Sequence, residues 1–244
     1  MNKQIFIYLT VAAITVAATF TSCNKDDYDK VKLLETVTYP YGEYYKYEYD
    51  SQNRITKWSR YNSSGELIQT STLTYSGNDL VQAVYNSNVI FEYTKSGNKI
   101  TSTYSGDDSQ TWDLNSEGQL VKYVAKIVGN SQVIEYLYQN GNIVKRNYVY
   151  TYAEGGTFET ITEYKYDNKK SPMYSCTTPQ WYLISSFMDM NSTNNMIEQK
   201  WTPASATGTD LYEYEYDSDG YPTKRTKTIN NGSKEVTEYV YKEL

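Results

Sequence analysis

The stretch YEYDSQNRITK, residues 47–57, decides the fold of this chain, and it recurs as YEYDSDGYPTK at residues 214–224. Each copy reads Tyr-x-Tyr, then turn-forming residues led by Asp, then an apolar residue followed by Thr and Lys. Degenerate copies begin at Phe91, Trp112 and Tyr136. Aromatic and charged residues alternate before each turn, which is the two-residue period of a β-strand. The unit therefore predicts two antiparallel strands joined by a tight turn.

Turn signals rich in Gly and Asn recur along the whole chain, as in 63–65, 76–78, 96–98, 140–142 and 230–232. Turns spaced this closely leave no room for the crossover helices that parallel strands need, so we expect an antiparallel up-and-down meander of about fifteen strands. We expect an all-β class with little helix, forming a single domain over residues 33–244.

One segment, at about 171–205, breaks the alternation and holds three of the five prolines and two of the four tryptophans. One interpretation is an irregular excursion that covers an end or edge of the sheet. The other is a binding loop, because long irregular segments in compact domains are often functional. In the second case the candidate ligand-binding residues are Tyr174, Trp181 and Trp201.

The N-terminus has the features of a secretory signal: Lys3, an apolar run from Ile5 to Phe20, and small residues before Cys23. The run is too short and too interrupted by Thr for a membrane-spanning helix. We expect residues 1–22 to be a lipoprotein signal peptide and residues 23–32 an acylated tether. Cleavage without lipidation is the alternative.

The Cys23 region resembles the lipobox of bacterial lipoproteins, in which the cysteine carries the lipid. The following Lys25, Asp26 and Asp27 resemble the surface-export signal of Bacteroidetes lipoproteins; the alternative is a solvated charged tether. Together with the Tyr-x-Tyr-Asp units and the segment 166–172 before the Trp-rich interruption, the chain resembles Bacteroidetes lipoproteins of unknown function with a porin-like fold. More distantly it resembles the YD repeats of toxin-encapsulating shells.

The first resemblance implies a sheet rolled into a partly closed barrel, a lipid anchor in the outer membrane and a cell-surface location. It transfers no catalytic residue. A barrel embedded in lipid would need an apolar residue at every second position of each strand. The strand at 211–216 instead places Glu213 and Glu215 on its non-aromatic face, so we expect a water-soluble domain held at the membrane only through Cys23.

Charge and composition limit the partners, catalytic groups and metal ligands that we expect for this chain. The net charge is −6, and it becomes −7 when Lys3 is removed with residues 1–22, which argues against a nucleic-acid partner. The chain contains no histidine and only two cysteines, so we expect no catalytic residues, no metal and no cofactor. The string from Glu215 to Gly220 matches the opening of a calcium loop but lacks Glu at its twelfth position, which is Thr226, so a plain turn is expected.

Two functions of different class fit these observations. The first is a non-catalytic binding or scaffold role that recognises a glycan or a partner protein through exposed aromatic residues. The alternative is a glycoside hydrolase or other carboxylate-based hydrolase, because Glu213 and Glu215 would stand ~6.5 to 7 Å apart along the strand. Binding predicts an aromatic patch, and hydrolysis predicts two facing carboxylates inside a concavity.

Overall fold

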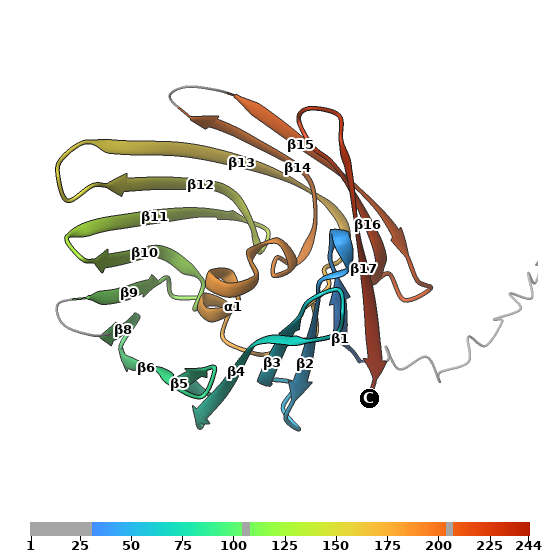
Figure 1. The fold of residues 1–244 in the computed structure, drawn as a ribbon, viewed down its shortest axis with the longest axis horizontal. Coiled ribbons are helices and arrows are strands. Elements are labelled where there is room, and N and C mark those ends of the chain that lie inside the picture. Colours follow the sequence, from blue (N-terminus) through green and yellow to red (C-terminus); the bar gives the residue numbers. More distant parts are fainter. Residues whose placement is uncertain (1–30, 104–107, 204–206) are drawn as a thin grey trace, which may run out of the picture.

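A computed structural model describes residues 31–103, 108–203 and 207–244 (Figure 1). The expected signal peptide at 1–22, the lipid site Cys23 and the export residues Lys25, Asp26 and Asp27 lie outside these residues. Within the described ranges, no helix is long and apolar enough to cross a membrane.

The described chain is all-β, as predicted, with 17 antiparallel strands in one sheet. Each strand from β1 to β6 and from β7 to β17 pairs with the next along the chain, and β17 returns to pair with β1, so the meander forms a nearly closed barrel. An interruption at Tyr93 divides one extended stretch into β6, which pairs with β5, and β7, which pairs with β8. The strands are β1 (Lys32–Thr38), β2 (Tyr44–Tyr49), β3 (Ile55–Tyr61), β4 (Leu67–Ser76), β5 (Asp79–Tyr85), β6 (Val89–Glu92), β7 (Thr94–Ser96), β8 (Lys99–Thr103), β9 (Ser109–Leu114), β10 (Leu120–Ile127), β11 (Asn130–Gln139), β12 (Asn142–Thr151), β13 (Thr157–Lys170), β14 (Asn194–Pro203), β15 (Gly208–Tyr216), β16 (Pro222–Thr228) and β17 (Lys234–Glu243).

The repeated turn is held by the carboxylate that opens it. Oδ1 of Asp217 accepts hydrogen bonds from the backbone amides of Asp219 and Tyr221, each at 2.9 Å. Asp50 does the same for Gln52 and Arg54. Asp217 also forms an ion pair with Lys32 at 2.8 Å, so the calcium-like string is an ordinary hairpin turn in this structure.

Tyrosine hydroxyls satisfy the backbone next to these turns. Six of them donate to a carbonyl on the preceding strand, and each acceptor residue lies at a β-bulge where the register shifts, which leaves backbone groups unpaired. The donor and acceptor pairs are Tyr49 with Leu34, Tyr75 with Ile55, Tyr138 with Leu120, Tyr166 with Ile143, Tyr214 with Met196, and Tyr241 with Pro222, at 2.8 to 3.0 Å.

The interior of the barrel is filled at one end by the segment between β13 and β14. This segment contains the 3-10 helix η2 (Met188–Met190) and the short helix α1 (Gln180–Phe187), which lies inside the curve of the sheet (Figure 1). The apolar side chains of α1 are buried, with Tyr182 and Leu183 each 2% exposed, whereas Ser185 and Ser186 are exposed. The irregular segment is shorter than expected: it ends at Thr193, because the residues from Asn194 pair with β13 although they lack a clean alternation. We call residues 171–193 the plug.

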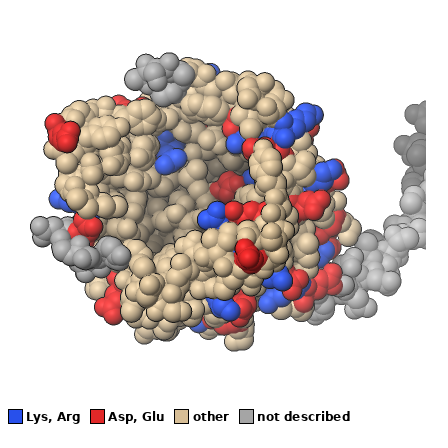
Figure 2. Space-filling model, in the orientation of Figure 1, with Lys and Arg blue, Asp and Glu red and all other residues tan. Residues whose placement is uncertain are grey.

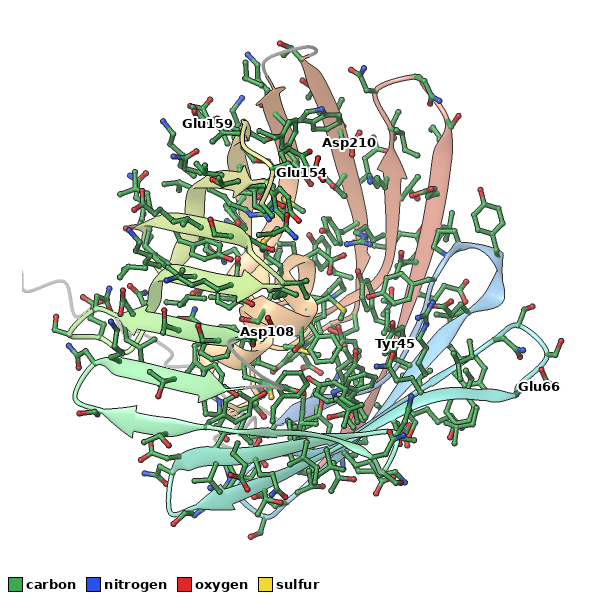
Figure 3. All side chains as sticks on the ribbon, turned by 60° about the vertical axis from the view of Figure 1, so that its left-hand side comes forward. Tyr45, Glu66, Asp108, Glu154, Glu159 and Asp210 are labelled. Atoms are coloured by element: carbon green, nitrogen blue, oxygen red, sulfur yellow. The ribbon has the colours of Figure 1, made fainter. Side chains whose placement is uncertain are left out.

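The two ends of the barrel differ. The turns at 50–54, 115–119 and 217–221 and the plug connect strands at one end, which we call the plug end, and β1 also begins there at Lys32. The opposite end, which we call the rim, carries the hairpins at 62–66, 152–156 and 229–233. Glu66 and Glu154 mark two of these hairpins in Figure 3, where Tyr45 lies on the inner side of the sheet toward α1.

The outer wall carries charged pairs between neighbouring strands. Examples are Lys57 with Glu48, Lys122 with Glu135, and Lys224 with Glu215, whose side chains are largely exposed. Charges on a lipid-facing wall cost several kcal/mol each near mid-bilayer. These positions of the outer wall therefore carry charges that contact with lipid would penalise.

Candidate functional site

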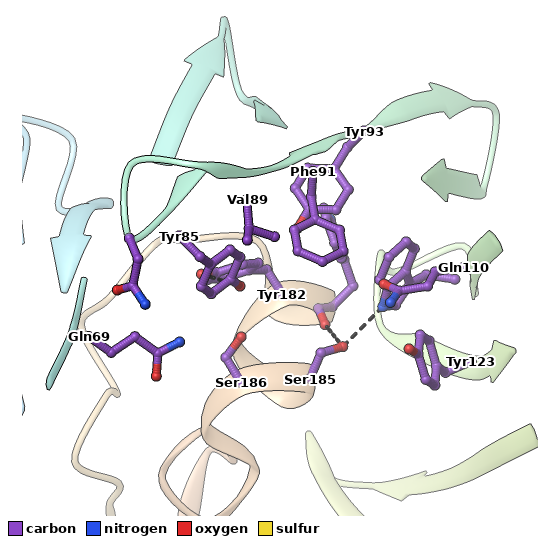
Figure 4. Close-up of a pocket in the computed structure, with 13 residues that line it drawn as sticks. Gln69, Tyr85, Val89, Phe91, Tyr93, Gln110, Tyr123, Tyr182, Ser185 and Ser186 are labelled. Carbon is purple, nitrogen blue, oxygen red and sulfur yellow. Dashed lines mark hydrogen bonds between the residues drawn. The ribbon is translucent and has the colours of Figure 1, made fainter. Parts of the chain in front are cut away.

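The barrel is hollow on its rim side. Figure 2 shows a deep depression in this face, with acidic and basic atoms visible inside it. Within the depression is a pocket of about 450 Å³, between α1 and the wall formed by β4 to β10. Four residues of the plug form its inner side: Trp181, Tyr182, Ser185 and Ser186 (Figure 4). We call it the lumenal pocket.

Aromatic rings form most of the lumenal pocket. The ring centroid of Trp181 lies 5.0 Å from those of Tyr93 and Trp112, and Trp112 lies 5.4 Å from Tyr123. On the other side Tyr85 meets Phe91 edge to face at 5.5 Å. These contacts fix the rings in place and leave their remaining faces and edges to line the cavity.

The polar groups of the lumenal pocket divide into two sets. One set is already used: the indole N–H of Trp112 donates to Ser185 Oγ at 3.0 Å, and Ser185 donates to the Trp181 carbonyl at 2.8 Å. The other set is free: the side chains of Gln69, Gln110 and Ser186 make no hydrogen bond to any residue that the structure describes. None of the residues that line the pocket is acidic or basic.

Burial keeps the phenols of this region neutral. Burial raises the pKa of Tyr123 to about 12, and it raises those of Tyr85 and Tyr93 further. Tyr85 and Tyr182 share a hydrogen bond at 3.3 Å, and Tyr182 also accepts one from the Trp58 indole at 3.0 Å. At neutral pH the lumenal pocket is therefore an uncharged site of ring surfaces, amides and hydroxyls.

A buried ion pair anchors the plug to the wall. Arg225, on β16, donates to Asp189 of η2 at 2.7 Å and to Thr237 Oγ1 at 3.2 Å. The Arg225 side chain is only 7% exposed, whereas that of Asp189 is 35% exposed. This pair fixes the position of the plug, and hence of the residues on α1 that line the lumenal pocket.

The structure places the three predicted ligand-binding residues in different settings. Trp181 is 4% exposed and lines the lumenal pocket. Trp201, on β14, faces the interior beside Thr162 and packs on Gly208, where a Cβ would collide with the indole. Tyr174 is 51% exposed and contacts Tyr221, at the plug end, so the three do not form one patch.

Most residues of the lumenal pocket come from strands that the sequence does not mark as part of a binding site. Phe91, Tyr93 and Trp112 belong to degenerate copies of the repeat, in which Phe or Trp replaces a Tyr. That replacement is the sequence signal that could have pointed to the site. The amides Gln69 and Gln110 carry no comparable signal.

Comparison with known proteins gives the fold and no more. No family model matches the chain. No curated protein matches it either. Among solved structures, a porin-like protein from Bacteroides uniformis ATCC 8492 is 16% identical with a TM-score of 0.54, covering 88% of this chain and 96% of its own. A porin-like protein from Bacteroides vulgatus ATCC 8482 is 14% identical with a TM-score of 0.46, covering 87% of this chain and 100% of its own. The first likeness shows that this chain has a fold similar to that of a Bacteroides porin-like protein.

Proposed function

We propose that this protein is a non-catalytic surface lipoprotein that binds an oligosaccharide in the lumenal pocket. The observation that carries the proposal is the combination of fixed aromatic rings with free amides and hydroxyls in a cavity that no charged residue lines. Ring faces suit the C–H faces of a sugar, and amides such as Gln110 suit its hydroxyls. A volume near 450 Å³ is typical of a small-molecule site.

The orientation of the barrel supports a role at the cell surface. β1 begins at the plug end, and the proposed lipid site at Cys23 precedes it in the chain. A tether attached there would hold the plug end toward the membrane. The rim and the lumenal pocket would then face the surroundings, where a glycan is available.

The hydrolase alternative has weaker support. Two interior carboxylates, Asp189 and Asp210, are each held by a cation: Arg225 at 2.7 Å and Lys227 at 3.0 Å. Both carboxylates are thus engaged by a neighbouring cation, whereas glycoside hydrolysis uses two carboxyl groups that face the sugar from opposite sides of the scissile bond. Glu213 and Glu215 lie on the outer wall, and Glu215 is paired with Lys224.

The binding proposal is tested by titrating the protein with oligosaccharides that an array identifies, while tryptophan fluorescence is recorded. Trp112 and Trp181 report the occupancy of the lumenal pocket. We expect Tyr123→Ala to weaken binding by about tenfold, the order of magnitude of one lost stacking contact. The matched control is Tyr174→Ala, which removes the same side chain at the plug end and should leave binding unchanged. Loss of binding in Tyr174→Ala with no change in Tyr123→Ala would contradict the proposal.

The anchor is tested separately by labelling cells with a radioactive fatty acid. The natural chain should incorporate label, and Cys23→Ser should not. Protease added to intact cells should degrade the natural protein if it is displayed outside. An unlabelled natural chain would contradict lipidation without bearing on the lumenal pocket.

A further inference from the structure

We propose that Arg146 binds a carboxylate of the ligand, so that the barrel recognises an acidic oligosaccharide. This inference rests on the proposed function of the lumenal pocket and adds the chemical class of its ligand.

Arg146 faces the interior from the middle of β12. Its cross-strand partners are Tyr136 on β11 and Thr162 on β13, and Thr162 is 4% exposed. The guanidinium lies over the ring of Tyr148, 5.3 Å from its centroid. Burial raises the pKa of Tyr136 to about 12 and also that of Tyr164, and the positive charge of Arg146 opposes both shifts. The guanidinium is therefore surrounded by neutral aromatic side chains.

Arg146 lacks the anionic partner that every other arginine of the chain has. It forms no ion pair with a described residue, and its Nε, like that of Arg225, is buried without a hydrogen-bond acceptor. Burying an N–H donor without a hydrogen-bond acceptor costs free energy. A carboxylate is a suitable acceptor because it can receive two parallel hydrogen bonds from one guanidinium. The other three are paired at 2.7 Å: Arg54 with Asp50, Arg60 with Glu43 and Arg225 with Asp189.

Two inner tyrosines, Tyr123 and Tyr136, lie on the strands between the lumenal pocket and Arg146. Tyr123 of the pocket pairs with Ile134 on β11, two residues from Tyr136, which is opposite Arg146. Two strand spacings and this offset separate Tyr123 from Arg146 by roughly 10 to 12 Å along the wall. An oligosaccharide with one ring in the lumenal pocket can reach Arg146 with a carboxylate on a neighbouring ring.

The experiment compares an oligosaccharide of uronic acids with its methyl ester, which has the same rings without the charge. Both are titrated by calorimetry against the natural protein, Arg146→Gln, Tyr123→Ala and Lys145→Gln. Lys145 is the next residue of β12 and faces the outer wall, so its replacement makes the same charge change outside the barrel. Circular dichroism confirms that each variant is folded, and Arg146→Lys is the substitute if Arg146→Gln is not.

We expect the natural protein to bind the acid about tenfold or more tightly than the ester, as a charged hydrogen-bonded pair implies. Arg146→Gln should lose this preference and keep its affinity for the ester, and Lys145→Gln should keep both. If Arg146→Lys is used instead of Arg146→Gln, we expect a weaker preference for the acid than in the natural protein, because an ammonium group cannot form two parallel hydrogen bonds to a carboxylate.

Three results would overturn the inference, and they separate a failure of the Arg146 role from a failure of the proposed function. Equal affinity for acid and ester, with binding still weakened by Tyr123→Ala, would remove the role of Arg146 and leave the lumenal pocket as the binding site. If Arg146→Gln still preferred the acid over the ester, the role of Arg146 would also be removed, and the lumenal pocket would again be left as the binding site. Affinities that Tyr123→Ala does not change would remove the proposed function as well.

Discussion

The hydroxyl group gives one physical reason why tyrosine recurs along this chain. At each repeat the ring packs inward, and in six strands its oxygen binds the carbonyl that a neighbouring bulge leaves unpaired. Phenylalanine would supply the ring without a hydrogen-bond donor. Serine would supply a donor, but its side chain is too short to reach the carbonyl on the preceding strand. In the units at 47–50 and 164–167 the second Tyr is this donor, so these units contribute to the bulge as well as to the strand.

This role predicts the effect of removing one oxygen atom. Tyr138→Phe leaves the Leu120 carbonyl without its donor at 2.9 Å, so the free energy of unfolding should fall by about 1–3 kcal/mol. The matched control is Tyr61→Phe, because Tyr61 stacks on Tyr44 through its ring and should change stability by less than about 0.5 kcal/mol. Urea unfolding measures both, and equal effects in the two variants would refute the role of the hydroxyl.

The turn carboxylates predict how stability depends on acid. Burial opposes ionisation of Asp50 and Asp217, but hydrogen bonds from Arg54, from Lys32 and from the backbone outweigh it and hold both pKa values below 3.8. Because the folded-state pKa is lower than that of the unfolded chain, this stabilisation is complete above about pH 4 and is lost as pH falls through the folded-state pKa.

The measurement is the thermal midpoint between pH 5 and pH 2. The natural protein should lose stability more steeply than the variant with Asp50→Asn and Asp217→Asn. Asparagine is a suitable replacement because Asn115 already holds the equivalent turn at 115–119 through its side-chain oxygen. Parallel curves for the two proteins would show that these carboxylates do not account for the acid sensitivity.

At the scale of elements, the plug depends on one ion pair. Breaking a fully buried pair costs about 3–5 kcal/mol, and we expect the lower end for Arg225→Met because the Asp189 side chain is 35% exposed. The double variant with Asp189→Leu should recover part of the loss, since it leaves no unpaired charge. Urea unfolding of the single and double variants gives the coupling energy, and purely additive effects would refute the anchoring role.

The elements also show where sequence reasoning succeeds and where it stops. Hairpins such as 47–57 follow from local alternation and turn chemistry, and these predict the all-β meander with little helix. The interior position of α1 is not encoded locally, because Trp181 and Phe187 are equally compatible with a lid over an edge. Only the closure of β17 on β1 creates the enclosed space that these residues fill.

The same limit applies to the candidate site. Trp181 could be selected from sequence as one of a few tryptophans in an irregular segment, and it does line the lumenal pocket. Arg146 could not be selected from sequence, because both faces of the strand at 142–152 mix polar and apolar residues. Its lack of an acidic neighbour results from how the strands pair in the folded barrel. The same reasoning selects Tyr174 and Trp201, yet the structure places neither of them in the lumenal pocket.

For the whole molecule, the buried phenols predict a sharp response to alkali. Burial raises the pKa of Tyr123 and Tyr136 to about 12, and it raises those of other inner tyrosines, including Tyr214 and Tyr241, further. Since their folded-state values exceed those of the unfolded chain, stability is complete below about pH 10 and is lost as pH rises toward the folded-state values.

Absorbance at the phenolate band and circular dichroism, followed together above pH 9, measure this response. The inner tyrosines should ionise in one cooperative step that coincides with loss of the β signal. Gradual ionisation with unchanged circular dichroism would mean that solvent reaches these hydroxyls in the folded barrel.

The closure of the barrel through β1 has a mechanical consequence. β1 is hydrogen-bonded on one side to β17 and on the other to β2, and the chain enters it at Lys32. A pull on the preceding residues would act along the strand and load both ladders in shear, so many hydrogen bonds would have to break together. If the proposed lipid on Cys23 anchors the protein, a force on that anchor would be borne in shear by the ladders that join β1 to β17 and to β2, and β1 would not peel away first.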